Sequence, residues 1–210
     1  MTPSLHDLAA AAYGADVWLF RHIHPAQRPS MTMARFARVL ADAPLLAGMA
    51  LLGLMGAMPR RWPRRIVVDA TLAIAGALVM NLGLALLWPR ARPFVAGVGQ
   101  AWMTHAATGS FPSDHLTAQW TLAGILLLQR STYRWGVAVA LLGLPMAWAR
   151  IYLGVHYPGD MLGALWVSTM ATLTLTLLRS QRSMGVAPWA SDRSQARQET
   201  CAKAITRPGE

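Results

Sequence analysis

Three short polar segments interrupt the apolar stretches of this 210-residue chain, and they contain residue types that bind and transfer phosphate. The segments read WPRARPF (residues 88–94), GSFPSDH (residues 109–115) and ARIYLGVHYPGDML (residues 149–162). Guanidinium groups bind phosphate oxygens through charge-assisted hydrogen bonds, and a histidine can act as a nucleophile or a general acid. If the fold brings these segments together, they predict a site for phosphoryl chemistry.

The second segment contains a predicted helix start. Pro112 restricts the residue before it to an extended conformation, and Ser113 is then well placed to cap the following helix. A helix N-terminus carries free backbone N–H groups and a positive potential, which suits a phosphate. His115 falls in the first turn of that helix, so we expect its imidazole to point into the same space.

The third segment combines an arginine with a histidine–aspartate pair. Arg150 closes an apolar run, and Pro158 favours the start of a new helix just after His156. Asp160 follows His156 by four residues, so one helical turn can bring its carboxylate to an imidazole N–H. One histidine held by a carboxylate can attack phosphorus, and the other can protonate the leaving oxygen.

The predicted site is expected to work without a metal ion or another cofactor. Phosphoryl transfer requires in-line attack and neutralisation of the equatorial phosphate oxygens. The polar segments contain no carboxylate cluster suited to Mg²⁺, so the arginines are expected to replace the metal.

The order and spacing of these residues resemble the three motifs of the type 2 phosphatidic acid phosphatase superfamily, over about residues 81–163. The family motifs are a Lys-x6-Arg-Pro, a Pro-Ser-Gly-His and a Ser-Arg-x5-His-x3-Asp. In this chain they read Ala85 to Arg92-Pro93, Pro112-Ser113-Asp114-His115, and Ala149-Arg150 with His156 and Asp160. The variants Arg-x-Arg-Pro-Phe and Tyr-Leu-Gly-Val-His-Tyr-Pro look most like the bacterial undecaprenyl-diphosphatase branch.

The resemblance implies a role for each matched residue. His156 would be the phosphohistidine nucleophile, Asp160 its partner, and His115 the acid and later the base. The phosphate would be held by Arg92, Ser113 and Arg150. The implied reaction is hydrolysis of undecaprenyl diphosphate to undecaprenyl phosphate and phosphate, which recycles a lipid carrier for cell-wall synthesis.

Three positions depart from the family motifs. Ala85 stands where the family has a lysine, Ala149 replaces the motif serine, and Asp114 replaces a glycine. Arg90 is the expected substitute for the lysine as a phosphate ligand. Two alternatives stay open: a phosphatidylglycerophosphate or phosphatidic acid phosphatase, and a non-catalytic lipid-binding or transport protein of the same fold. His105 matches no motif and is interpreted as an interfacial histidine.

The elements that must position these residues are predicted to be membrane-spanning helices. The chain is 54% hydrophobic and only 13% charged, which is too apolar for an ordinary soluble domain. Its formal net charge of +10 is therefore attributed to cytoplasmic loops rather than to nucleic-acid binding. The candidate spans are residues 43–58, 70–89, 116–129, 135–149 and 161–178. We expect an all-α, polytopic integral membrane helix bundle.

The two ends of the chain differ from this core. Residues 5–24 mix ionisable and apolar side chains, which predicts an amphipathic helix lying in the membrane interface. A short helix at about residues 32–40 is expected to lead into the first span. The predicted organisation is an interfacial segment (residues 1–38), a transmembrane phosphatase domain (residues 39–180) and a disordered cytoplasmic tail (residues 181–210).

The distribution of arginines predicts the topology. The linker PRRWPRR (residues 59–65), the segment QRSTYR (residues 129–134) and the segment RSQR (residues 179–182) all fall on one side of the predicted bundle. The positive-inside rule assigns that side to the cytoplasm. We therefore expect a protein of the bacterial cytoplasmic membrane whose site faces the periplasm or the cell exterior. Its expected partners are a polyprenyl diphosphate and the lipid bilayer.

Overall fold

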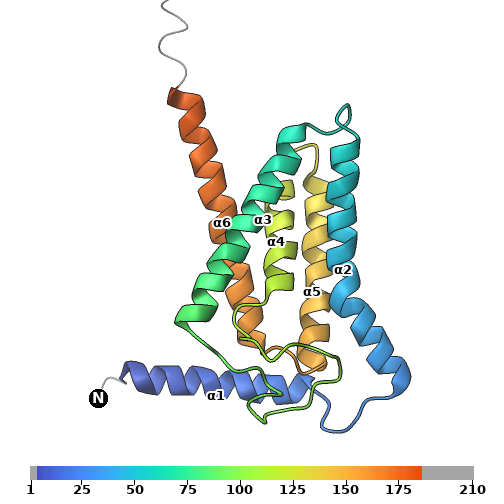
Figure 1. Cartoon of the computed structure of the whole chain (residues 1–210), viewed down its shortest axis with the longest axis vertical. Coiled ribbons are helices and arrows are strands. Elements are labelled where there is room, and N and C mark those ends of the chain that lie inside the picture. The colour runs from blue at the N-terminus through green and yellow to red at the C-terminus, as the bar shows by residue number, and fades with distance from the viewer. Residues whose placement is uncertain (1–3, 186–210) are drawn as a thin grey trace, which may run out of the picture. The chain divides into compact units, whose positions relative to one another are not determined.

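The computed structural model describes residues 4–185 and contains six helices and no strand within that range (Figure 1). In chain order they are α1 (Leu5–Ile23), α2 (Met31–Ala57), α3 (Arg64–Leu87), α4 (Asp114–Leu127), α5 (Tyr133–Tyr152) and α6 (Pro158–Gly185). Residues up to Thr172 form one compact unit, and the part of α6 from Leu173 onward belongs to a second. The predicted all-α fold class is confirmed.

Four helices, α2, α3, α5 and α6, are long and apolar enough to cross a membrane. Their exposed faces carry large apolar side chains, among them Leu46, Val79 and Leu141. Such faces are unfavourable in water and favourable in hydrocarbon, so the chain is a multi-pass membrane protein.

The fifth predicted crossing, α4, is only 14 residues long. At 1.5 Å per residue it extends for about 21 Å, which is shorter than the hydrocarbon core of about 30 Å. It packs against α3, α5 and α2, and most of its side chains are buried. A helix enclosed by its neighbours contacts protein rather than lipid, so its ends need not reach both surfaces of the bilayer.

Two predicted boundaries differ from the structure. α2 is one continuous helix from Met31, with Pro44 inside it, so the short helix expected at residues 32–40 and the first span are a single element. α6 continues to Gly185 and so includes the first residues of the predicted tail. The rest of that tail, residues 186–210, lies outside the described residues.

α1 lies crosswise at one end of the helix bundle (Figure 1). A capping box starts it: the Asp7 N–H donates to Ser4 Oγ, and the Ser4 N–H donates to the Asp7 carboxylate. Phe20 is buried in a cluster with residues of α4, α5 and α6, whereas Trp18 on the same helix is 62% exposed. A helix with one anchored face and one exposed apolar face fits the predicted interfacial helix.

The three polar segments meet at the α1 end of the bundle. Consecutive helices run antiparallel, so the connections 88–113 and 153–157 fall at the same end (Figure 1). The Trp102 N–H donates to the Leu153 carbonyl over 2.9 Å, and the Ser113 N–H faces the Asp160 carbonyl at 3.4 Å. The two connections therefore form one layer that covers the ends of the helices.

Gly154 allows these connections to approach each other. Its φ of +79° lies in the left-handed region, which disfavours residues with a Cβ. A Cβ at this position would also collide with the carbonyl oxygen of Gln100. Glycine therefore sets the path of the chain just before His156.

Candidate active site

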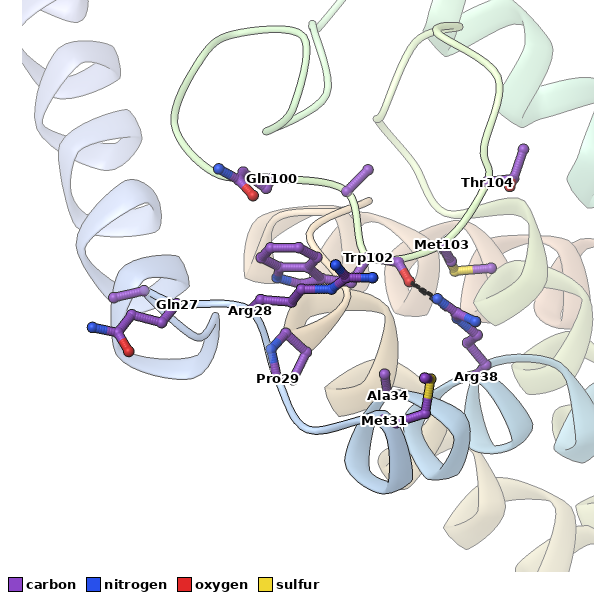
Figure 2. Close-up of a pocket in the computed structure, with 12 residues that line it drawn as sticks. Gln27, Arg28, Pro29, Met31, Ala34, Arg38, Gln100, Trp102, Met103 and Thr104 are labelled. Carbon is purple, nitrogen blue, oxygen red and sulfur yellow. Dashed lines mark hydrogen bonds between the residues drawn. The ribbon is translucent and has the colours of Figure 1, made fainter.

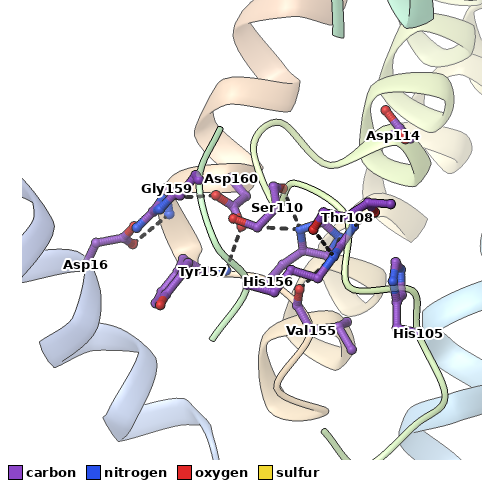
Figure 3. Close-up of polar contacts among 12 residues, drawn as sticks. Asp16, His105, Thr108, Ser110, Asp114, Val155, His156, Tyr157, Gly159 and Asp160 are labelled. Atoms are coloured by element: carbon purple, nitrogen blue, oxygen red, sulfur yellow. Dashed lines mark hydrogen bonds and ion pairs between the residues drawn. The ribbon is translucent and has the colours of Figure 1, made fainter. Parts of the chain in front are cut away.

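His156 is held in one orientation by groups on both sides of its ring (Figure 3). Its Nδ1 lies 2.9 Å from the Ser110 carbonyl oxygen and 3.2 Å from Asp160 Oδ2. Both partners are acceptors, so Nδ1 carries the proton and Nε2 keeps a lone pair. Nε2 lies 3.0 Å from Arg92 Nη1, which is a donor. The ring therefore presents an unprotonated nitrogen toward an arginine.

The start of α6 explains the histidine–aspartate pair. Pro158 is the first residue of the helix, and Asp160 lies in its first turn. Asp160 Oδ2 accepts the Tyr157 N–H at 2.8 Å as well as facing the imidazole of His156. The carboxylate is fully buried, so these hydrogen bonds replace its hydration. One local motif thus caps the helix and orients the histidine.

The pKa of His156 is lowered well below its usual value of 6.5. Burial is the main cause, because it disfavours the charged imidazolium. The positive charges of Arg92 and Arg150 lower the pKa further. The ring is therefore neutral near pH 7 and its Nε2 is available for attack.

Arg92 is fixed beside His156 by both connections. Its Nε donates to the Thr108 carbonyl at 3.1 Å, and its Nη1 donates to the Val155 carbonyl at 2.9 Å. The residue is 5% exposed, and burial lowers the pKa of its guanidinium below its ordinary value. Its partners Thr108, Val155 and His156 are labelled in Figure 3.

Arg150 and Ser113 carry buried polar atoms without a hydrogen-bond partner among residues 4–185. Arg150 Nη2 donates to Asp42 Oδ1 at 3.1 Å, but its Nε and Nη1 are buried and unpaired. Ser113 occupies the N-cap position of α4, as expected, yet its side chain makes no capping hydrogen bond and its Oγ is buried and unpaired. Unpaired buried donors cost free energy, and phosphate oxygens could satisfy all of them.

His115 faces a carboxylate that the sequence motifs do not include. Its Nε2 lies 3.6 Å from Asp42 Oδ1, the same oxygen that accepts from Arg150. Asp42 belongs to α2, and about half of its side chain is exposed. His115 is also partly exposed, so the pair lies nearer the surface than His156.

Asp114, which replaces the motif glycine, is tied to α3. Asn81 Nδ2 donates to Asp114 Oδ1 at 2.8 Å. Asn81 also bonds to Thr117, one turn further along α4. This contact gives the Asp114 carboxylate a hydrogen-bond partner away from the histidines.

The structure pairs Arg90, the expected substitute for the motif lysine, with two carboxylates. Arg90 Nη1 lies 3.0 Å from Asp160 Oδ1, and Nη2 lies 2.5 Å from Asp16 Oδ2. Two carboxylates of low exposure thus hold the guanidinium, and its role as a phosphate ligand stays a prediction. Arg90 therefore lies on the Nδ1 side of His156, opposite Arg92.

His105, interpreted from the sequence as an interfacial residue, lies beside the site. Its ring centroid is 6.0 Å from that of His156, and the two planes are nearly perpendicular. Burial lowers its pKa from 6.5, its hydrogen bond to the Ala106 carbonyl raises it, and the charges of Arg92 and Arg150 lower it. Sequence patterns also provided no signal for Asp16 or Asp42, because both are isolated acids within otherwise ordinary helices.

Two cavities lie at this end of the protein. One of about 940 Å³ is lined by the α1–α2 connection and residues 100–104, where Arg38 donates to the Trp102 carbonyl (Figure 2). None of the predicted site residues lines it. The other, of about 560 Å³, lies between α1 and the start of α6 and includes Asp16 and Arg90 in its wall.

Residues 66–184 match the family model described as the PAP2 superfamily, and this stretch is more than half of the chain. The chain therefore belongs to the PAP2 superfamily. Its helical fold and its three polar segments agree with that membership.

Two relatives share a little over a third of the aligned residues. YbjG of Escherichia coli (strain K12), provisionally named an undecaprenyl-diphosphatase, is 36% identical over 115 residues, or 55% of this chain and 58% of that protein. The undecaprenyl-diphosphatase BcrC of Bacillus subtilis (strain 168) is 35% identical over 105 residues, or 50% of this chain and 53% of that protein. The chain thus spans little more than half the length of these relatives.

A solved structure supports the fold. The transmembrane PAP2-type phosphatidylglycerolphosphate phosphatase of Bacillus subtilis aligns with a TM-score of 0.60 and 18% identity, over 85% of this chain and 89% of that one. At this identity the likeness concerns the arrangement of helices.

Proposed function

We propose that this protein is a membrane phosphatase that hydrolyses undecaprenyl diphosphate to undecaprenyl phosphate and phosphate. The observation that carries the proposal is the state of His156, whose unprotonated Nε2 faces Arg92 while Nδ1 faces a carboxylate. The names of the two relatives supply the substrate class.

The first step of the proposed reaction is attack by His156 on the terminal phosphorus. A bond forms between Nε2 and phosphorus, and the bond from phosphorus to the bridging oxygen breaks. His115 gives a proton to the departing oxygen of undecaprenyl phosphate. Asp160 stabilises the positive charge on the imidazole through the Nδ1 proton.

The second step is hydrolysis of the phosphohistidine. His115 has lost its proton in the first step, so it can take one from a water molecule that attacks the phosphorus. The N–P bond breaks, phosphate leaves and His156 returns to its neutral form. Arg92, Arg150 and Ser113 bind the equatorial oxygens throughout. The buried, unpaired polar atoms of Arg150 and Ser113 support this role.

Phosphatidylglycerophosphate and phosphatidic acid remain the alternative substrates. Ala85 and Ala149 remove two polar side chains found in the family motifs, which changes how the head group can be held. The same losses are the argument for a non-catalytic lipid-binding or transport protein. The orientation of His156 is the argument for catalysis.

The protein is further proposed to act in the bacterial cytoplasmic membrane with its site on the outer face. The arginine-rich connection 58–63 lies at the end of the bundle opposite the connection between α5 and α6 (Figure 1). A charged diphosphate crosses hydrocarbon poorly, so an enzyme must meet the head group on the face where it is produced.

The test is phosphate release by the purified protein in detergent. Wild-type protein is expected to release phosphate from undecaprenyl diphosphate with a kcat/KM about tenfold or more above that for phosphatidic acid or phosphatidylglycerophosphate. His156→Ala should lower kcat by roughly a thousandfold or more, since it removes the attacking atom.

The controls separate loss of chemistry from loss of fold. The His156→Ala protein should keep the wild-type elution volume and thermal unfolding midpoint. If it kept more than about a tenth of wild-type activity, His156 would not be the nucleophile. If wild-type protein bound the lipid without releasing phosphate, the non-catalytic alternative would replace the proposal.

A further inference from the structure

A chain of charged side chains joins α1 to His156. Asp16 Oδ2 lies 2.5 Å from Arg90 Nη2, and Arg90 Nη1 lies 3.0 Å from Asp160 Oδ1. Asp160 Oδ2 in turn lies 3.2 Å from His156 Nδ1. All four side chains are at most 15% exposed, so water screens these interactions weakly. Asp16, Asp160 and His156 are labelled in Figure 3.

The positions of Asp16 and Arg90 are fixed by further contacts. Asp16 Oδ1 accepts the Gly159 N–H, in the first turn of α6, at 2.7 Å. The Arg90 guanidinium lies 4.0 Å from the ring centroid of Tyr157 and 5.7 Å from that of Tyr13. Stacking and ion pairing therefore hold the guanidinium between the two carboxylates.

Asp16 lies outside the part of the chain that matches the family. The matched residues, 66–184, include Arg90, His156 and Asp160 but none of α1. α1 therefore adds a charged group to a chain of charged side chains whose other three members lie within the matched stretch.

The charges explain what Asp16 contributes. A guanidinium paired only with Asp160 would neutralise the carboxylate that faces the imidazole. With Asp16 as a second partner, the three groups together carry one net negative charge. Transfer of phosphate to Nε2 makes the imidazole cationic, and a buried negative charge stabilises that state.

We propose that Asp16 is a positioning residue that acts through Arg90, sharing its guanidinium so that Asp160 keeps its negative charge toward His156. This inference rests on the proposed function, because it concerns the nucleophile of that reaction. It makes the interfacial helix α1 a part of the catalytic apparatus as well as a membrane contact.

The test is a double-mutant cycle measured by phosphate release from undecaprenyl diphosphate in detergent. Asp16→Asn, which keeps the size of the side chain, should lower kcat about tenfold and change KM less than about twofold. Arg90→Gln should also lower kcat. In the Arg90→Gln background, Asp16→Asn should cause no further loss, because its effect is transmitted by Arg90.

Asp7→Asn is the matched control. It removes the same charge from the same helix, but Asp7 is exposed and its carboxylate bonds to Ser4 in the capping box of α1. Its kcat should equal that of the wild type. Equal losses from Asp7→Asn and Asp16→Asn would overturn the inference, because they would reflect the charge of α1 in general.

Gly159→Ala tests the geometry with every charge left in place. A Cβ on Gly159 would lie 2.7 Å from Asp16 Oδ2, so the carboxylate must shift from its present position, and we expect this shift to disturb its pairing with Arg90. The expected result is a fall in kcat like that of Asp16→Asn, with KM again nearly unchanged. An unchanged kcat in this variant would contradict the inference.

The remaining outcomes separate this inference from the proposed function. Suppose that wild-type protein releases phosphate and that Asp16→Asn lowers kcat by the same factor in the wild-type and the Arg90→Gln backgrounds. That result would reject the role of Asp16 and leave the proposed function standing. An effect of Asp16→Asn on KM alone would also reject it. A wild-type protein that releases no phosphate would overturn the function, and this inference with it.

Discussion

At the residue scale, the proposed chemistry depends on which nitrogen of His156 carries the proton. Two acceptors, the Ser110 carbonyl and Asp160, compete for Nδ1, so the proton resides there. Arg92 then contacts Nε2 without protonating it, because a guanidinium remains charged at physiological pH. In the proposed mechanism, the same arginine that lowers the pKa of the ring binds the incoming phosphate.

The first residue-scale prediction concerns pH. The nucleophile must be neutral, and its pKa lies well below 6.5, so the neutral form persists as the pH falls through 6.5. The acid-side inflection of kcat/KM, which reports the free enzyme, should therefore lie below pH 6.5. It is measured between pH 4.5 and 8, with the thermal unfolding midpoint followed at each pH as a control for stability. An inflection at or above pH 6.5 would contradict the conclusion that the burial and surroundings of His156 keep its imidazole neutral.

The second residue-scale prediction concerns metal removal. Among residues 4–185, no group of three or more His, Cys, Asp or Glu side chains could hold a metal ion. Arginines should therefore neutralise the phosphate oxygens, and phosphate release should survive incubation with EDTA. The measurement compares initial rates before and after chelation. If activity fell and Mg²⁺ restored it, the arginine-based mechanism would be wrong.

At the element scale, the enclosed helix α4 is held close to α5 by a small residue. Gly143 of α5 faces the indole of Trp120 on α4, and a Cβ on Gly143 would collide with the indole nitrogen. Trp120 is already held by a 3.3 Å hydrogen bond to the Ala140 carbonyl. Small residues allow membrane helices to approach closely, and this contact supports the helix that carries Ser113 and His115 at its start.

The element-scale prediction follows from this contact. Gly143→Ala should lower the stability by about 1–3 kcal/mol, because the added methyl forces the indole out of its position. Gly76→Ala on α3 is the matched control, since a Cβ there meets nothing within 4 Å. Thermal unfolding of both variants in one detergent measures the difference. Equal midpoints would show that the α4–α5 contact tolerates the extra volume.

At the scale of the whole molecule, the site lies at one end of the bundle and a cluster of four exposed arginines lies at the other. Arg60, Arg61, Arg64 and Arg65 are exposed around the α2–α3 connection. At the site end, Arg92 and Arg150 are buried and bound to protein groups. The positive-inside rule concerns charges that must stay in the cytoplasm, and it assigns the exposed set to that side.

The molecule-scale prediction is the sidedness of single cysteines. Cys201, the only natural cysteine, is first replaced by serine. Ala107→Cys, on the exposed part of the connection near Arg92, should then react with a membrane-impermeant thiol reagent in intact spheroplasts. Pro59→Cys, in the arginine-rich connection, should react only after lysis.

Both variants need the same control. Each should react fully in detergent, which shows that the thiol is accessible. Exposed arginines also lie at the site end, with Arg28 in the α1–α2 connection and Arg35 near the start of α2, so labelling is a direct test of the topology. The reverse pattern would place the site in the cytoplasm and remove the proposed role in recycling a carrier on the outer face.

The sequence by itself determines the features that depend on local spacing and hydropathy. Apolar runs predict the bundle, since the bilayer requires long apolar helices. Pro158 predicts the start of α6. His156 and Asp160 are four residues apart, about the length of one helical turn, and this interval predicts their pairing. Ser113 at the start of α4 follows from the same kind of local rule, although the structure shows that its hydroxyl makes no capping bond.

Only the tertiary structure decided which residues far apart in the sequence contact one another at the site. Arg90 pairs with Asp160, 70 positions away. Asp16 meets Arg90 across 74 positions, and Asp42 meets Arg150 across 108. Isolated acidic residues in amphipathic or apolar helices form no periodic pattern from which their partners could be predicted. Such contacts arise when packed helices bring buried charges together, because a buried charge is stable only beside an opposite one.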